Sequence, residues 1–136
     1  MLHTPLPMIG VRGILLLARR VERLPLGDRA DATRLYIGNI VRMQEEIGTG
    51  GGGFRFLYAS FLQELEAKTG YTALGALSAR LVEIGDRWRE FALAAARMIR
   101  GRDPLAPPAL AERLRALAAD EKRFFQDLQD AQRAWA

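Results

Sequence analysis

Residues 74–98 read LGALSARLVEIGDRWREFALAAARM and residues 110–135 read LAERLRALAADEKRFFQDLQDAQRAW, and these two stretches decide the fold. In both, apolar residues recur at alternating steps of three and four, which places them on one stripe of an α-helix. The first stripe comprises Leu74, Leu77, Leu81, Ile84, Trp88, Phe91, Ala95 and Met98. The second comprises Leu110, Leu114, Leu117, Glu121, Phe124, Leu128, Ala131 and Trp135, with Glu121 as its polar exception.

A short break separates these helices. Residues 101–108 read GRDPLAPP, in which the glycine suits the end of one helix and the prolines suit the start of the next. Two long helices joined by so short a connection are expected to fold back on each other as an antiparallel hairpin.

The remaining sequence predicts an all-α bundle of about five helices with a long antiparallel C-terminal hairpin. No segment alternates apolar and polar residues with the period of a strand, and 136 residues suit a single domain over 1–136. We expect an extended arm over 1–10 and helices over about 11–23, 28–47, 54–69, 72–100 and 108–135. Most aromatic residues are expected in the core, while Phe56 and Phe125 fall off the main stripes and could mark a contact surface.

Composition excludes several kinds of chemistry. The chain has no cysteine, so it can supply no disulfide, thiol nucleophile, zinc–thiolate site or iron–sulfur cluster. His3 is its one histidine, which argues against a catalytic triad or a multi-histidine metal site, and no Glu-x-x-His motif is present. We therefore expect no catalytic residue, no metal and no cofactor.

The charged residues are 20 basic and 16 acidic, a net charge of +4. They alternate along the predicted helices in the manner of solvated faces, and the densest basic cluster is Arg19, Arg20 and Arg23. We expect no nucleic-acid partner, because a phosphate backbone calls for a longer basic stripe. No apolar run approaches the ~20 residues of a membrane span, so we expect a cytoplasmic protein without membrane contact.

A glycine-rich segment is the least ordinary part of the chain. It comprises Gly48, Thr49, Gly50, Gly51, Gly52 and Gly53, and a predicted helix with Arg55 in its first turn follows. Free backbone amides at a helix start could hold an anion, and Arg55 could add a charged contact. The segment lacks the Lys-Ser/Thr ending of a phosphate-binding P-loop, and a plain interhelical turn is favoured over a binding role.

Glu121 interrupts an otherwise apolar seam. A carboxylate in that position needs a partner, so we expect a structural ion pair with an arginine, or a seam position that opens to solvent. Trp135 lies on the same seam and is expected to pack, either within the chain or on a partner.

The chain resembles a known helical domain family along almost its whole length. The similarity lies in Ile47–Arg55 followed by Leu57-Tyr58 and Phe61-Leu62-x-Glu64, in Gly10-Val11-Arg12-Gly13-Ile14, and in Ile84-Gly85-Asp86-Arg87-Trp88. In that family a helical domain of uncharacterised function follows an acyltransferase domain related to butirosin biosynthesis protein H. Such acyltransferases are similar to papain-like cysteine enzymes and move an acyl group from a carrier-protein thioester onto an amine.

The resemblance implies an accessory role. The nucleophilic cysteine of the family lies in the preceding domain, so we expect this chain to support or dock to a papain-like acyltransferase domain, in cis or in trans, in secondary-metabolite biosynthesis. The residues that match the family motif are our candidate contact site: Gly48, Thr49, Gly50, Gly51, Gly52, Gly53, Arg55 and Tyr58.

Two alternatives remain open. The glycine-rich segment could bind a phosphate or phosphopantetheine group. The chain could also be a homodimeric structural bundle in which the seams of 74–98 and 110–135 pair between two copies.

Overall fold

The computed structural model describes residues 6–45 and 52–135. Within them the chain forms five α-helices and two short 3₁₀ turns, with no strand. The helices are α1 (Leu6–Glu22), α2 (Ala30–Glu45), α3 (Arg55–Thr69), α4 (Ala73–Ile99) and α5 (Pro107–Trp135). The 3₁₀ turns η1 (Gly27–Arg29) and η2 (Gly52–Phe54) precede α2 and α3. The predicted all-α bundle is confirmed.

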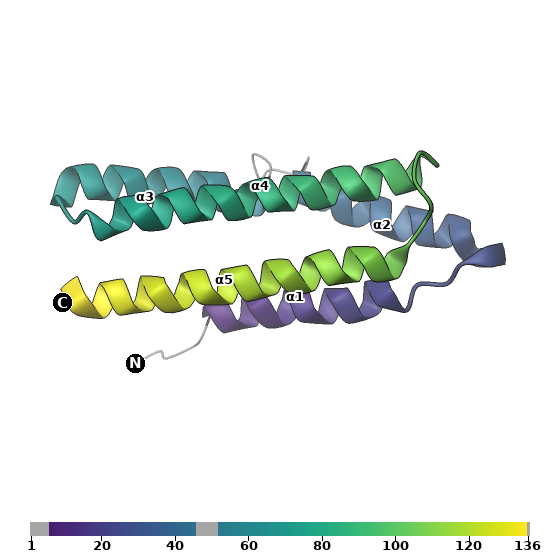
Figure 1. The fold of residues 1–136 in the computed structure, drawn as a ribbon, viewed down its shortest axis with the longest axis horizontal. Coiled ribbons are helices and arrows are strands. Elements are labelled where there is room, and N and C mark those ends of the chain that lie inside the picture. Colours follow the sequence, from purple (N-terminus) through teal and green to yellow (C-terminus); the bar gives the residue numbers. More distant parts are fainter. Residues whose placement is uncertain (1–5, 46–51, 136) are drawn as a thin grey trace.

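The two longest helices, α4 and α5, form a long antiparallel hairpin along which the other helices pack (Figure 1). Every member of the predicted α4 seam is buried, from Leu74 to Met98. On α5 the seam is buried from Leu110 to Phe124. Between the two helices, Gly101 has a positive φ of 71°, which turns the chain after the end of α4. Pro107 is the first residue of α5. The two seams face each other within one chain, which gives the hairpin its apolar interface.

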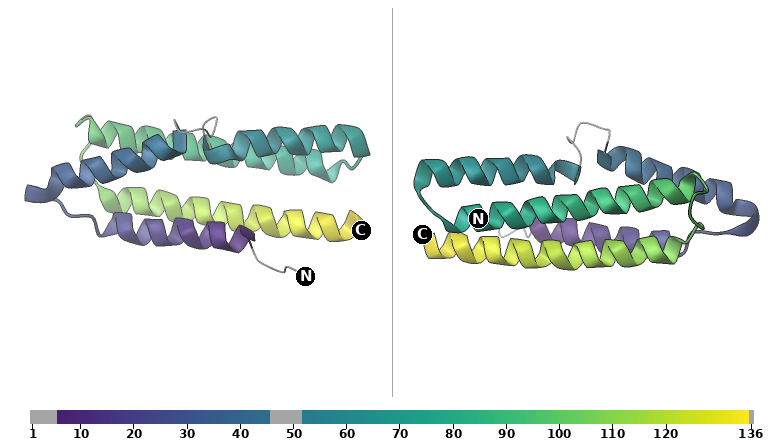
Figure 2. Two further views of the ribbon diagram at one scale, coloured as in Figure 1. Left: turned by 180° about the vertical axis from the view of Figure 1, so that it is seen from behind. Right: turned by 45° about the horizontal axis from the view of Figure 1, so that its top comes forward.

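The shorter helices lie along this hairpin in two rows. α2 and α3 follow one another along α4, while α1 lies along α5 (Figures 1 and 2). α1 buries Val11, Ile14, Ala18 and Val21, a helical stripe at steps of three and four. Because α1 has 17 residues and α5 has 29, a good part of α5 has no helix of the second row beside it.

Three predicted boundaries need correction. Residues 6–10 belong to α1 and not to an extended arm, since a proline in the first turn of a helix lacks only an N–H that has no intrahelical partner. Residues 1–5 lie outside the described part. The helix predicted over 28–47 starts at Ala30, after the 3₁₀ turn, and is described as far as Glu45; the helix predicted from residue 54 starts at Arg55.

The predicted aromatic core is right for α4 and for Phe124 of α5, and wrong for most of α3. Trp88, Phe91 and Phe124 are buried, and Phe56 and Phe125 are partly buried. On α3, however, Ala59 and Leu62 face the core, and the aromatic side chains on either side of them are exposed. None of the described helices combines the length and the apolarity that a bilayer crossing requires.

Candidate functional site

The start of α3 is held by a buried polar cluster. Arg55 donates from Nε to Glu121 Oε1 at 2.6 Å, and its Nη2 lies 2.6 Å from the same oxygen. Trp88 donates from its indole nitrogen to Glu121 Oε1 at 3.0 Å, and the Arg55 guanidinium lies 4.5 Å from the centre of the Trp88 ring. One carboxylate on α5 therefore fixes groups from α3 and α4.

The side chains of this cluster are largely buried. The Glu121 side chain is 5% exposed and that of Arg55 is 21% exposed. A buried carboxylate is stable only when charged and neutral donors satisfy it, and here a guanidinium and an indole do so. The structure thus confirms the expected ion pair of Glu121 with an arginine.

The end of α2 is tied to the same region. Gln44 is buried and donates to the backbone carbonyl of Trp88 at 2.9 Å. The Gly52 amide donates to Glu45 Oε1 at 3.1 Å, and Arg55 Nη1 lies 3.4 Å from the Gly52 carbonyl. Both flanks of the glycine-rich segment are therefore anchored on α4 and α5 by side chains of α2 and α3.

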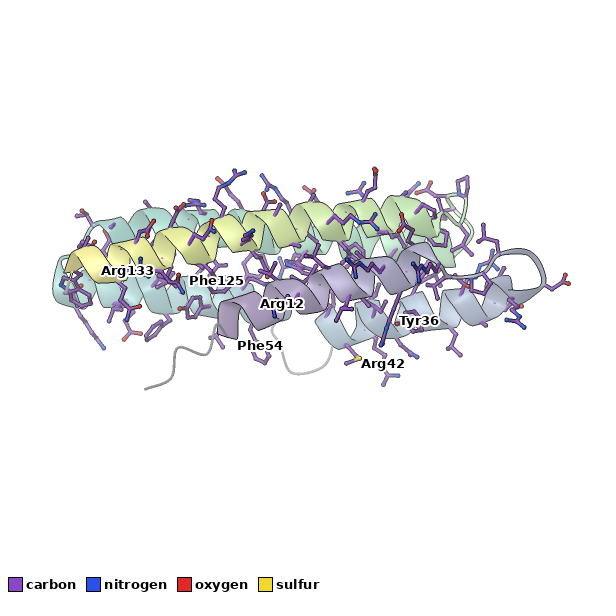
Figure 3. All side chains as sticks on the ribbon, turned by 90° about the horizontal axis from the view of Figure 1, so that it is seen from below. Arg12, Tyr36, Arg42, Phe54, Phe125 and Arg133 are labelled. Carbon is purple, nitrogen blue, oxygen red and sulfur yellow. The ribbon has the colours of Figure 1, made fainter. Side chains whose placement is uncertain are left out.

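Phe54 takes an unusual backbone conformation directly before α3. Its φ is 69°, and it is the one non-glycine residue with a positive φ in the part of the chain that the structure describes. A bulky residue in this left-handed region is strained by about 1–3 kcal/mol. The Phe54 side chain is nevertheless 53% exposed, so burial of the ring does not compensate for the strain. Figure 3 shows its ring projecting away from the ribbon.

An exposed apolar surface continues from Phe54 along α3. Leu57, Tyr58 and Phe61 are 66%, 38% and 53% exposed, and the rings of Tyr58 and Phe61 stack with centroids 6.1 Å apart. With Phe54 they recur at helical spacing, and we call this set of four the α3 stripe. Partial burial raises the pKa of the Tyr58 hydroxyl above its ordinary value of 10.0.

The predicted contact residues do not form one surface. Gly48, Thr49, Gly50 and Gly51 lie outside the described residues. Gly52 and Gly53 are the first two residues of η2, and Gly52 has a φ of 59°. Arg55 points inward to Glu121, and Tyr58 points outward on the α3 stripe.

The inward direction of Arg55 bears on the anion-binding alternative. Its guanidinium already contacts Glu121, the Gly52 carbonyl and the Trp88 ring. An anion at the start of α3 would have to compete with a buried carboxylate for this group.

The sequence did not reveal the α3 stripe as a surface. Its spacing marks one apolar face of a helix, but spacing alone does not say whether that face meets the core or a partner. One available signal was the small size of Ala59 and Ser78, which marks the side on which α3 and α4 approach closely. In the structure Ser78 donates a hydrogen bond to the Ala59 carbonyl at 2.7 Å.

Other kinds of site lack support in the described residues. Across 6–45 and 52–135, no three histidine, cysteine, aspartate or glutamate side chains gather in the manner of a metal site. A shallow cavity of about 120 Å³ between α4 and α5 is lined by Arg80, Glu83, Arg87, Asp120 and Arg123. Arg87 pairs there with Asp120, and Arg80 pairs with Asp127, so these groups serve as interhelical ion pairs.

Comparison with known proteins identifies a family. Neither the curated proteins nor the solved structures give a match. The family described as "Domain of unknown function (DUF4872)" matches residues 1–128, which is nearly the whole chain. The chain therefore belongs to this DUF4872 family.

Proposed function

We propose that this chain is a non-catalytic helical accessory domain that docks to a papain-like, butirosin-type cysteine acyltransferase domain through the α3 stripe. The single observation that carries the proposal is the exposure of four apolar side chains at helical spacing, the first of which is the strained Phe54. The resemblance to the helical domain that follows such acyltransferases supplies the kind of partner.

The size of the stripe supports a docking role. From their exposed fractions and the areas typical of such side chains, the four residues expose roughly 400 Å² of mostly apolar surface. Patches of about 300–600 Å² are the largest on typical monomers and are often functional, and one partner of a standard interface buries about 800 Å². The stripe is thus large enough to form the centre of a contact surface.

The buried cluster supports a rigid, pre-formed surface. Glu121, Arg55 and Trp88 fix the first turn of α3, so the stripe would meet a partner without a large loss of conformational entropy. The charged groups of this region are used to hold the helix, and the reacting cysteine would come from the partner domain.

Co-expression with a butirosin-type acyltransferase domain tests the proposal. We expect the two to co-purify and the complex to be lost in the double variant Leu57→Glu, Phe61→Glu. Leu93→Glu is the matched control, because Leu93 on α4 is 63% exposed and lies outside the stripe. Failure of the wild-type chain to bind, or equal binding by the stripe variant, would reject the proposal.

Self-association through the same stripe is the second candidate. The α4 seam, and the α5 seam from Leu110 to Phe124, are buried within one chain, so a homodimer would use the α3 stripe and not these parts of the seams. Light scattering on the isolated chain distinguishes the two functions: a dimer that Phe61→Glu converts to a monomer would assign the stripe to a second copy.

A further inference from the structure

A second surface of the molecule is strongly basic and lies on α1. Arg12, Leu16 and Arg19 recur at steps of four and three residues, which places them on one side of the helix, and Arg23, directly after its last residue Glu22, continues the same spacing. Arg20 lies next to Arg19, and all four arginines are exposed. We call Arg12, Arg19, Arg20 and Arg23 the basic face of α1; Figure 3 shows Arg12 on this face.

This face holds most of the net charge of the chain. Residues 6–23 contain four arginines and Glu22, a net charge of +3 out of +4 for the whole chain. Glu22 is already bound by Arg115, with Nη2 2.6 Å from Oε2 and Nη1 3.2 Å from Oε1. Among the described residues, none of the four arginines forms a salt bridge, although Arg23 lowers the pKa of Glu22 through space.

The neighbouring helix adds to the same charge. α1 and α5 run antiparallel, and Glu22 lies level with Arg115. Leu15 lies seven residues before Glu22 on α1, and Lys122 lies seven residues after Arg115 on α5. Leu15 therefore lies level with Lys122, which is exposed. Lys122 therefore lies at a level between Arg12 and Arg19.

Apolar side chains are interleaved with these charges. Leu15 is 39% exposed and Leu16 is 55% exposed. A nucleic-acid backbone offers nothing apolar for them to contact, and the face carries no aromatic residue on which a base could stack. The apolar stripe of α1, from Val11 to Val21, is buried against the bundle, so α1 cannot insert it into a membrane.

We infer that the basic face of α1 is a second docking surface, whose partner is an acidic protein helix with carboxylates on one face and an apolar residue among them. Arginine forms paired hydrogen bonds with carboxylates and is enriched in protein interfaces, while the leucines supply apolar contact. This surface is separate from the α3 stripe and stands whether or not the stripe binds an acyltransferase.

A defined peptide tests the inference on the full chain. The probe is an alanine-based helical peptide of about 20 residues with glutamates on one face and one leucine among them; its control has the same composition with the glutamates spread around the helix. We expect the first peptide to bind at least about tenfold more tightly, and its affinity to fall between about 50 mM and about 200 mM salt.

Two charge-matched variants locate the binding. Arg12→Glu, Arg19→Glu, Arg23→Glu should abolish binding of the peptide, while Arg100→Glu, Arg102→Glu, Arg133→Glu should retain it, although both change the net charge equally. Circular dichroism checks that both variants fold. Equal loss in both variants, or equal binding of the two peptides, would overturn the inference, as would the absence of any binding.

Two further probes decide the class of partner. These are a DNA duplex of about 20 base pairs and phosphatidylcholine vesicles with about 30% phosphatidylserine. Tighter binding of either than of the helical peptide would reject a protein partner and assign the face to nucleic acid or to a lipid surface.

Discussion

Glu121 is the residue on which the start of α3 depends. Its carboxylate accepts hydrogen bonds from Arg55 and Trp88 in a nearly water-free position. Removing one member of such a cluster leaves the other polar groups buried without compensation, which is more damaging than the loss of an exposed ion pair.

We predict that Glu121→Ala lowers the free energy of unfolding by about 3 kcal/mol. Glu112→Ala on the exposed side of the same helix should change it by less than about 0.5 kcal/mol. Urea denaturation followed by circular dichroism measures both. Similar values for the two variants would show that the buried cluster does not hold the fold.

Glu22 provides a pH-dependent link between α1 and α5. The hydrogen bond from Arg115 lowers the pKa of Glu22 from its ordinary value of 4.5, and Arg23 contributes least among the causes. A carboxyl group whose pKa is lower in the folded state than in the unfolded state stabilises the fold at any pH above its unfolded-state pKa. This stabilisation is lost as the pH falls through the folded-state pKa.

Carbon-13 NMR titration of the Glu22 carboxyl group should give a midpoint below 4.5. Arg115→Gln should move the midpoint back toward the ordinary value, and Arg23→Gln should move it less. Equal shifts in the two variants would mean that general charge, and not the hydrogen bond, sets the pKa.

At the scale of elements, α3 and α4 approach each other through glycine. A Cβ atom added at Gly85 would lie 2.8 Å from ring atoms of Phe56, whose ring also lies 4.4 Å from the Arg89 guanidinium. Phe56 thus fills the space that the missing side chain leaves. This explains why a residue off the main stripe of α3 still packs.

We predict that Gly85→Ala destabilises the protein by about 1–3 kcal/mol through overpacking. Gly13→Ala is the control, because Gly13 lies in α1 with no atom within 4 Å of an added Cβ. It should stabilise the protein by up to about 1 kcal/mol, since alanine favours helix. Thermal unfolding measures both, and adding Phe56→Leu should recover part of the loss at Gly85.

The elements differ in how far the sequence predicts them. α4 and α5 follow from their seams, which are buried from Leu74 to Met98 on α4 and, with Glu121 as the polar member, from Leu110 to Phe124 on α5. α3 carries apolar residues on more than one side, so spacing could not tell the core side, with Ala59 and Leu62, from the exposed α3 stripe. The pairing of Arg55 with Glu121 joins residues 66 positions apart, and local sequence holds no signal for that distance.

The whole molecule is unevenly stabilised. α4 has buried residues on nearly every turn, from Leu74 to Met98, whereas the buried residues of α2 are Thr33, Ile37 and Gln44. Segments with few buried contacts open at lower free energy than the core elements.

Native-state hydrogen exchange should show this difference directly. We expect amides in the middle of α2 to exchange at least about tenfold faster than those in the middle of α4, because α2 opens without unfolding the hairpin. Equal rates in the two helices would show that the bundle unfolds as one cooperative unit.

Two requirements conflict at Phe54: its left-handed backbone conformation favours glycine, whereas the α3 stripe needs an aromatic side chain at this position. A glycine there would relax the chain and favour heat resistance, yet it would delete the exposed ring that begins the α3 stripe. Laboratory evolution for thermal tolerance alone is therefore expected to accept glycine at residue 54, whereas selection for partner capture should restore an aromatic side chain.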